Sequence, residues 1–223
     1  RRAELDRSPD PPFVPIAQNQ HNMQDSRQLK LLAVNALTVM GMISALIAIM
    51  LIIRGAFALS LAVAVVGFVC DSLDGPLARR LSVVTRFGAG FDALVDLMLY
   101  LVYPAVSWYI FFAFHDVLAL LVLLFFLLCG SFRLVRTATK GVQLGQTRHY
   151  FVGVPVVLSL PLLIGSFAIT LIEPGWNSTY LYATLPLFSL FMVSRIPFPK
   201  PRGRELYVLL ILSAAIAFGI LVL

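Results

Sequence analysis

Seven long apolar segments dominate this chain and leave few folds open to it. About 20 apolar residues form a helix that spans a bilayer, whereas membrane barrels are built from ~10-residue segments of alternating hydrophobicity. The segments here are longer and apolar all round. We therefore predict an all-α fold, a polytopic transmembrane bundle of about seven membrane helices. The segments are 31–53, 56–78, 90–113, 117–138, 151–172, 179–194 and 205–223.

The composition favours a membrane domain over residues 29–223. Hydrophobic residues make up 60% of the chain and charged residues 13%, whereas a soluble domain is about 45–50% apolar and ~25% charged. Residues 1–28 are polar, with prolines and scattered charges that disfavour a long regular helix. We expect them to form an irregular cytoplasmic or interfacial arm. Pro155, Pro161 and Pro186 fall in the fifth and sixth segments, which we expect to be tilted or irregular.

The lysines and arginines indicate how the bundle is oriented. With the N-terminus in the cytoplasm, every basic residue except Arg54 falls on the cytoplasmic side, as the positive-inside rule requires. These residues then face anionic lipid headgroups, so the net charge of +6 predicts bilayer lipids as partners and no nucleic acid. We expect a multi-pass protein of a cytoplasmic membrane.

Four aspartates stand out against this apolar background. Asp71 and Asp74 lie at the cytoplasmic end of the second segment, and Asp92 and Asp96 lie near the start of the third. A charge at the bilayer centre costs at least ~3 kcal/mol, so four of them in one membrane chain indicate a function. A helix advances about 100° per residue, which puts Asp71 and Asp74 on one face and stacks Asp92 with Asp96. The short link between the two helices allows these faces to meet.

Carboxylates gathered in this way would repel one another and take up protons unless they bind cations. Ligand sets made only of oxygen suit Mg²⁺, Mn²⁺ or Ca²⁺, and two such ions can clamp a phosphate or diphosphate. The small residues Gly75, Ala78 and Gly88 leave room for a ligand against the backbone, and Arg79 can neutralise a phosphate oxygen. The pattern predicts a metal-dependent phosphate site on the cytoplasmic side.

The stretch from residue 71 to residue 96 reads D-x2-D-G-x2-A-R-x8-G-x3-D-x3-D, and it resembles the motif of the CDP-alcohol phosphotransferase family at every fixed position. Members of that family are integral membrane enzymes. They displace CMP from a CDP-linked lipid or alcohol with the hydroxyl of a second alcohol. The resemblance implies a divalent-metal cofactor of two ions, Mg²⁺ or Mn²⁺.

The resemblance also implies a role for each motif residue. It makes Asp96 the catalytic base and gives Asp92 a catalytic part as well. The implied metal ligands are Asp71, Asp74, Asp92 and Asp96, and the implied CDP-binding residues are Asp74, Gly75, Ala78, Arg79 and Gly88.

Two further regions resemble the phosphatidylserine synthase branch of bacteria and archaea. One is FRLVRTATK at 132–140 with YFVGVP at 150–155, and the other is FMVSRIPFPKPR at 191–202. The match departs at Thr137, Val156 and Val157. This resemblance implies a CDP-diacylglycerol-type donor, L-serine as acceptor and a prokaryotic cytoplasmic membrane. The sequence is compatible with a homodimer.

Basic residues near the fourth segment are candidates for binding the acceptor. A guanidinium group recognises a carboxylate such as that of serine in a partly desolvated cavity. The alternative for each residue is an anchor at the membrane surface. The candidates are Arg133, Arg136, Lys140, Arg148 and Tyr150.

Other functions remain open at this point. The same family chemistry can use glycerol phosphate, inositol phosphate or choline as the acceptor. A membrane prenyltransferase also binds a diphosphate through aspartates and Mg²⁺, but it does not need the G-x2-A-R element. A carboxylate-lined cation transporter would place its acidic residues near the bilayer midplane. Metal-dependent release of CMP from a CDP-lipid separates these classes.

Overall fold

The computed structural model describes residues 16–143, 150–172 and 178–199. The seventh apolar segment, 205–223, and the candidate Arg148 lie outside these residues. The elements in chain order are α1 (Ile16–Ile53), α2 (Phe57–Arg80), α3 (Arg86–Leu97), the π-helical η1 (Met98–Val102), α4 (Tyr103–Phe111), α5 (Val117–Gln143), β1 (Tyr150–Val152), the 3-10 turn η2 (Val156–Leu158), α6 (Ser159–Ile172), the 3-10 turn η3 (Ser178–Tyr180), α7 (Leu181–Val193) and β2 (Pro197–Pro199).

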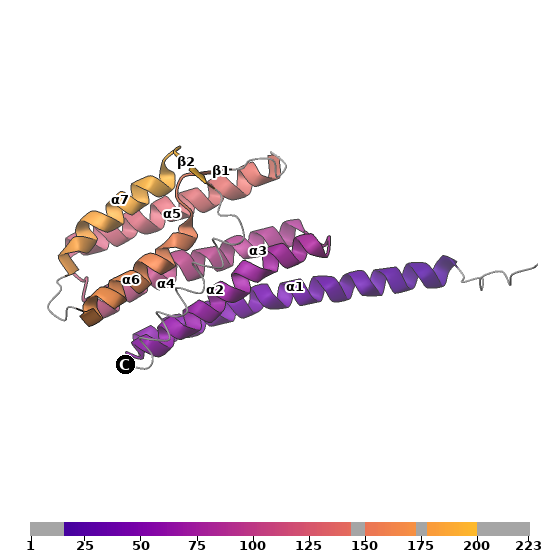
Figure 1. The fold of residues 1–223 in the computed structure, drawn as a ribbon, viewed down its shortest axis with the longest axis horizontal. Coiled ribbons are helices and arrows are strands. Elements are labelled where there is room, and N and C mark those ends of the chain that lie inside the picture. Colours follow the sequence, from indigo (N-terminus) through magenta and orange to yellow (C-terminus); the bar gives the residue numbers. More distant parts are fainter. Residues whose placement is uncertain (1–15, 144–149, 173–177, 200–223) are drawn as a thin grey trace, which may run out of the picture.

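The helices form an elongated bundle (Figure 1). On one side α1 runs along α2, and on the other α5 runs along α7 while α6 lies against α4. A rod made of α3, η1 and α4 passes between them. The prediction of a helical membrane protein is confirmed for the described residues, because four of their helices are long and apolar enough to cross a bilayer. These are Arg27–Ile53, Phe57–Arg80, Arg86–Phe111 and Val117–Thr139.

The fifth and sixth predicted segments form shorter helices, Val156–Thr170 and Leu181–Val193. In the fifth segment, helical structure starts only after Pro155, because a proline disfavours the helical conformation in the residue before it. Residues 150–152 instead pair with 197–199 as a two-stranded antiparallel sheet, with Val152 opposite Pro197. These six residues depart from the all-α prediction. Among the described residues four helices have the length of a full span, and the count of seven, whose last segment lies outside them, stays a prediction.

The N-terminal arm also differs from the prediction. Helix α1 begins at Ile16, so residues 16–28 are helical rather than irregular. The last proline of this region is Pro15, and a proline is tolerated before a helix but not inside it. Beyond Pro15 nothing in the sequence prevents the helix of the first apolar segment from extending back.

Small residues bring α1, α2 and α3 close together. A Cβ atom added at Gly67 of α2 would lie 3.1 Å from the Cβ of Ser44 on α1, and one added at Gly41 would lie 3.3 Å from a methyl group of Val95 on α3. Such glycines allow helix backbones to approach closely in a membrane. This packing determines which side chains of α1 can reach the carboxylates of α2.

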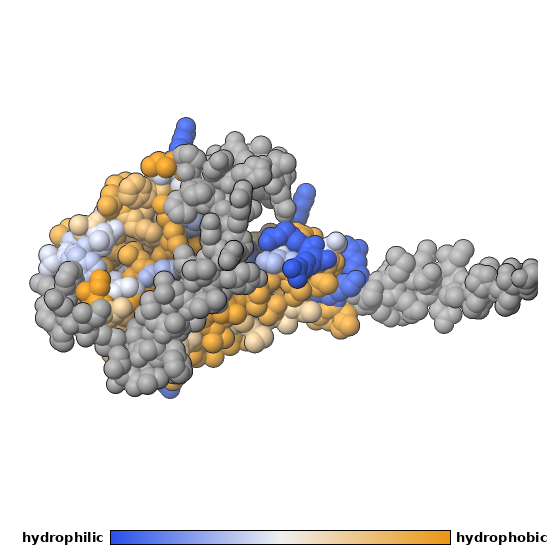
Figure 2. Space-filling model, viewed as in Figure 1, coloured by the Kyte–Doolittle hydropathy of each residue, from blue (hydrophilic) through white to orange (hydrophobic). Residues whose placement is uncertain are grey.

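Apolar side chains cover the outside of the bundle as well as its core. On α5, Leu118, Leu121, Leu124 and Leu128 are each more than half exposed, as expected for a surface that faces lipid. Figure 2 shows apolar residues along the sides and hydrophilic residues gathered at the end where α2 gives way to α3. The basic residues Arg79 and Arg80 end α2 there, whereas Arg54 precedes its opposite end.

Candidate active site

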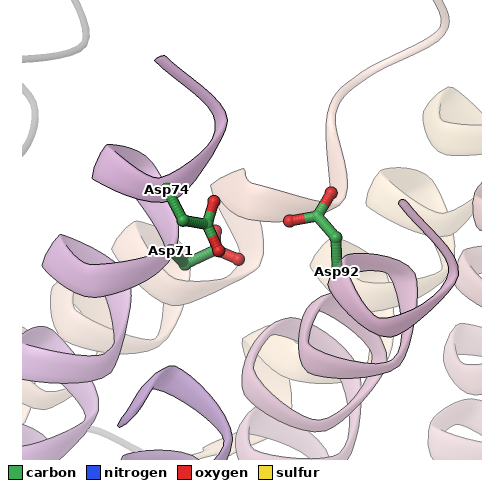
Figure 3. Close-up of side chains that lie close together, drawn as sticks. All are labelled: Asp71, Asp74 and Asp92. Carbon is green, nitrogen blue, oxygen red and sulfur yellow. The ribbon is translucent and has the colours of Figure 1, made fainter. Parts of the chain in front are cut away.

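Three carboxylates meet where α2 and α3 face each other. Asp71 and Asp74 lie near the C-terminal end of α2, and Asp92 lies on α3; one oxygen of each is within 4.8 Å of the others. Figure 3 shows the three side chains turned toward one another across the gap between the helices. In the short link between α2 and α3, Thr85 caps the start of α3. Its hydroxyl accepts a hydrogen bond of 3.0 Å from the Gly88 amide.

Two buried hydroxyl groups hold these carboxylates in place. Thr38 of α1 donates a hydrogen bond of 2.7 Å to Oδ2 of Asp74, and Tyr100 of η1 donates one of 2.6 Å to Oδ2 of Asp71. Among the described residues, the other oxygen of Asp71, Oδ1, is buried and has no hydrogen-bond partner. An unpaired carboxylate oxygen away from water is unfavourable, so this site has a place for a cation or a donor.

The donor set fits a hard divalent cation. The three clustered side chains offer only oxygen, which is the ligand type of Mg²⁺, Mn²⁺ and Ca²⁺. The oxygen of Asp71 that has no partner adds an available ligand atom in the same cluster. We conclude that the residues present suit the metal that the sequence motif implies.

A pocket lies beside the carboxylates, between α1, the end of α2 and the start of α3. All five residues predicted to bind CDP line it, and α1 adds three more that the sequence analysis missed. The lining residues are Val34, Asn35, Thr38, Asp74, Gly75, Ala78, Arg79, Val83, Val84, Thr85, Gly88, Ala89 and Asp92. Because these residues belong to three elements, the pocket exists only in the packed bundle.

Asp96 lies one turn beyond Asp92 on α3 and is not part of the 4.8 Å set. Its carboxylate is repelled by Asp71 and attracted by Arg133 of α5. Arg133 is only 5% exposed, and among the described residues its Nε has no hydrogen-bond partner. A buried guanidinium group with an unused donor is suited to receive an anion.

Arg136 has different surroundings from Arg133. Its guanidinium group donates hydrogen bonds to the carbonyl oxygens of Val193 at 2.8 Å, Met192 at 3.3 Å and Ser194 at 3.4 Å. It therefore ties α5 to the end of α7. Of the other acceptor candidates, Lys140 belongs to the last turns of α5 and Tyr150 to β1.

The family of the chain follows from comparison with known proteins. Residues 31–193 match the model of the CDP-alcohol phosphatidyltransferase family. The chain belongs to this family. The matched region contains the whole aspartate motif and the pocket, so the resemblance seen in the sequence is confirmed and the chain is a transferase. Membership in this family also excludes the prenyltransferase and cation-transporter alternatives.

Relatives of known function within the family are similar over much of the chain. A CDP-diacylglycerol–serine O-phosphatidyltransferase of Methanocaldococcus jannaschii is 31% identical over 164 residues, which are 73% of this chain and 71% of the relative. One of Mycobacterium leprae is 31% identical over 138 residues, 59% of this chain and 46% of the relative. One of Saccharomyces cerevisiae is 36% identical over 107 residues, 44% of this chain and 37% of the relative.

Besides Val34 and Asn35 of the pocket, two residues that bond to the carboxylates escaped the sequence analysis. Tyr100 follows Asp96 by four residues and continues the stripe of Asp92 and Asp96 along the rod, a spacing that would have revealed it. Thr38 gave no such signal, because it contacts a residue 36 positions away in the sequence.

Proposed function

We propose that this chain transfers the phosphatidyl group of a CDP-diacylglycerol-type lipid to the hydroxyl group of L-serine and releases CMP. The observation that carries the proposal is the juxtaposition of the carboxylate cluster with the pocket lined by Gly75, Ala78, Arg79 and Gly88. The names of the relatives from three organisms support serine as the acceptor.

We assign the donor nucleotide to the pocket. Glycine at positions 75 and 88 leaves space against the helix backbones, and a Cβ atom at Gly75 would lie 3.5 Å from the guanidinium group of Arg79. Arg79 is thus positioned to meet a ligand that lies over Gly75, and its charge suits a phosphate oxygen. Asp74 borders both the pocket and the carboxylate cluster.

We assign two divalent ions, Mg²⁺ or Mn²⁺, to the carboxylates. Asp71, Asp74 and Asp92 would hold them, with Asp96 at the edge of the site. When bound, such ions neutralise the diphosphate and make CMP a better leaving group. Without cations the three carboxylates repel one another, so metal binding also stabilises the junction of α2 and α3.

The reaction then needs positioning and one proton transfer. The serine hydroxyl oxygen attacks the phosphorus that carries the diacylglycerol, while Asp96 accepts the hydroxyl proton. The bond between this phosphorus and the bridging oxygen breaks, CMP leaves with the electron pair, and phosphatidylserine is the product. Asp96 suits the role of base, because it stands outside the three-carboxylate set yet next to it.

Arg133 is our candidate for binding the serine carboxylate. It is buried, and its charge attracts that of Asp96, so we place the serine carboxylate at Arg133 and the serine hydroxyl toward the proposed base. A charge-assisted contact of this kind is strong in a partly desolvated cavity.

We further propose that this end of the bundle faces the cytoplasm, because Arg79, Arg80 and Arg86 gather there and Arg54 lies at the other end of α2.

An acceptor screen tests the proposal. The purified chain in detergent is given a CDP-diacylglycerol donor with Mg²⁺ or Mn²⁺, and CMP release is measured with serine, glycerol phosphate, inositol phosphate or choline. We expect release that needs the metal and serine. Release with glycerol phosphate or inositol phosphate but not with serine would disprove the acceptor assignment and keep the family chemistry. No metal-dependent release with any acceptor would contradict the whole proposal.

A further inference from the structure

We infer that Tyr100 is a positioning residue that holds Asp71 in the orientation needed to bind the metal. The inference rests on the proposed function, because it concerns the same carboxylate cluster. Tyr100 itself belongs neither to the predicted motif nor to the pocket. Its hydroxyl occupies Oδ2 of Asp71 at 2.6 Å, which leaves Oδ1 as the oxygen available to a cation.

Burial and two contacts hold Tyr100 in place. The side chain is fully buried, and its ring packs edge-to-face against Phe68 of α2, with the ring centroids 6.1 Å apart. The backbone carbonyl of Tyr100 accepts a hydrogen bond from the hydroxyl of Ser159, at the start of α6. The hydroxyl group at the ring's far end therefore meets Asp71 from a rigid support rather than from a mobile side chain.

The π-helical turn of η1 explains why this support exists. In a π-helix the backbone bonds run from residue i to i+5, and single π-turns inside α-helices are frequent at functional sites. Here the turn spans Met98–Val102 and interrupts the rod between α3 and α4. Ser159 bonds to a carbonyl within this turn, so α6 stabilises the local geometry that aims Tyr100 at Asp71.

A buried tyrosine hydroxyl normally has a hydrogen-bond partner, so a purely structural role must be separated from a role in metal binding. Among the described residues Oδ1 of Asp71 is buried without a hydrogen-bond partner, and it lies in the carboxylate cluster. A carboxylate that only accepted the Tyr100 hydrogen bond would gain nothing from this arrangement. The position of Oδ1 therefore favours a role in metal binding. Groups that hydrogen-bond to metal ligands typically change metal affinity 10–100-fold when removed.

The test compares Tyr100→Phe with Tyr103→Phe in the purified full chain. Both changes remove one buried hydroxyl from the same rod and keep the ring. The Tyr103 hydroxyl lies 3.2 Å from Ser60 Oγ, away from the carboxylates, and is the matched control. The affinity for Mn²⁺ is measured without nucleotide, by titration calorimetry or electron paramagnetic resonance, together with the thermal midpoint without metal.

We expect Tyr100→Phe to weaken Mn²⁺ binding about 10–100-fold, with the thermal midpoint no lower than that of Tyr103→Phe and with kcat largely restored at saturating Mn²⁺. Tyr103→Phe should keep the wild-type Mn²⁺ affinity. An Asp71→Asn variant separates the two proposals. If Asp71→Asn loses Mn²⁺ and Tyr100→Phe does not, the inference is wrong while the metal site stands. If the wild-type chain binds no Mn²⁺, both are wrong.

Discussion

Arg136 on α5 donates a hydrogen bond of 2.8 Å to the carbonyl oxygen of Val193, the last residue of α7. The final carbonyl groups of a helix have no partner within it and carry the negative end of the helix dipole. A guanidinium group placed there donates hydrogen bonds to these carbonyl groups and offsets the negative end of the dipole. Arg133, three residues earlier, is buried instead, and among the described residues its Nε has no hydrogen-bond partner. The two arginines that the sequence treats alike therefore have different surroundings, and mutations should distinguish them.

Arg136→Ala should destabilise the protein. Removing the guanidinium group leaves carbonyl groups at the end of α7 without a donor, which costs about 1.5–3 kcal/mol for a charged hydrogen bond. We expect a lower thermal midpoint in detergent, partly restored by Arg136→Lys, and an unchanged midpoint for the exposed control Arg80→Ala. A variant with a normal midpoint and a raised KM for serine alone would show that Arg136 binds the acceptor.

Arg133→Ala should raise the KM for serine. Loss of one charge-assisted contact typically costs ~1.5–3 kcal/mol, which corresponds to roughly a ten- to hundredfold effect. The KM for the CDP-lipid should change little, because we assign the donor to α1, α2 and α3. Arg133→Lys should recover only part of the loss, since an ammonium group makes no bidentate contact. Steady-state kinetics with each substrate varied decides this, and an equal loss for both substrates would contradict the assignment.

Asp92→Asn should abolish turnover without unfolding the protein. Asp92 is the only carboxylate that α3 adds to the three-residue cluster, so its loss weakens metal binding from that side. The change also removes repulsion among the carboxylates, and the thermal midpoint without metal should therefore hold or rise. More than about a tenth of the wild-type rate at saturating metal would count against the assignment, since even a tenfold loss of rate corresponds to a change of only ~1.4 kcal/mol in the activation free energy.

Gly75→Leu should prevent CDP binding while Mn²⁺ still binds. Gly75 lines the pocket, and the added side chain would fill the space beside the guanidinium group of Arg79, which is 3.5 Å from the position of a Cβ atom. Gly165→Leu on α6 is the control, because a Cβ atom there meets open space and α6 contributes nothing to the pocket. Calorimetry with CDP measures the effect. Normal CDP affinity in Gly75→Leu would mean that the nucleotide binds elsewhere.

Gly153→Ala should be among the most damaging changes in the chain. Gly153 has a φ of +81°, and a Cβ atom would lie 2.4 Å from the carbonyl oxygen of Met192 and 2.9 Å from that of Ser194. Backbone strain of this kind costs of order 1–3 kcal/mol, and the clash with main-chain atoms adds to it. Thermal unfolding should show a larger loss of stability than for Gly165→Ala, and equal midpoints would disprove the close packing seen here.

Much of the site was predictable because its main determinants are local. The lengths of the apolar segments indicate membrane helices, since a bilayer sets the helix length. The spacing of Asp71 to Asp74 and of Asp92 to Asp96 indicates which carboxylates share a face, since the helical repeat is constant. The predicted nucleotide residues lie within 15 positions of one another, on two helices joined by a tight link, and they line one pocket.

Other features depend on contacts between distant parts of the chain. Thr38 bonds to Asp74 across 36 residues, Tyr100 to Asp71 across 29, and Arg136 to Val193 across 57. The predictions of an irregular arm over 16–28 and of helix at 150–152 were wrong, because local propensity does not show which neighbour a backbone segment will meet. By itself the sequence determined the apolar membrane helices and the residues of the carboxylate cluster. Only the tertiary structure decided that the hydroxyl groups of Thr38 and Tyr100 hold them, because close packing at Gly41 and Gly67 and the π-turn at η1 select the side chains that can reach the site.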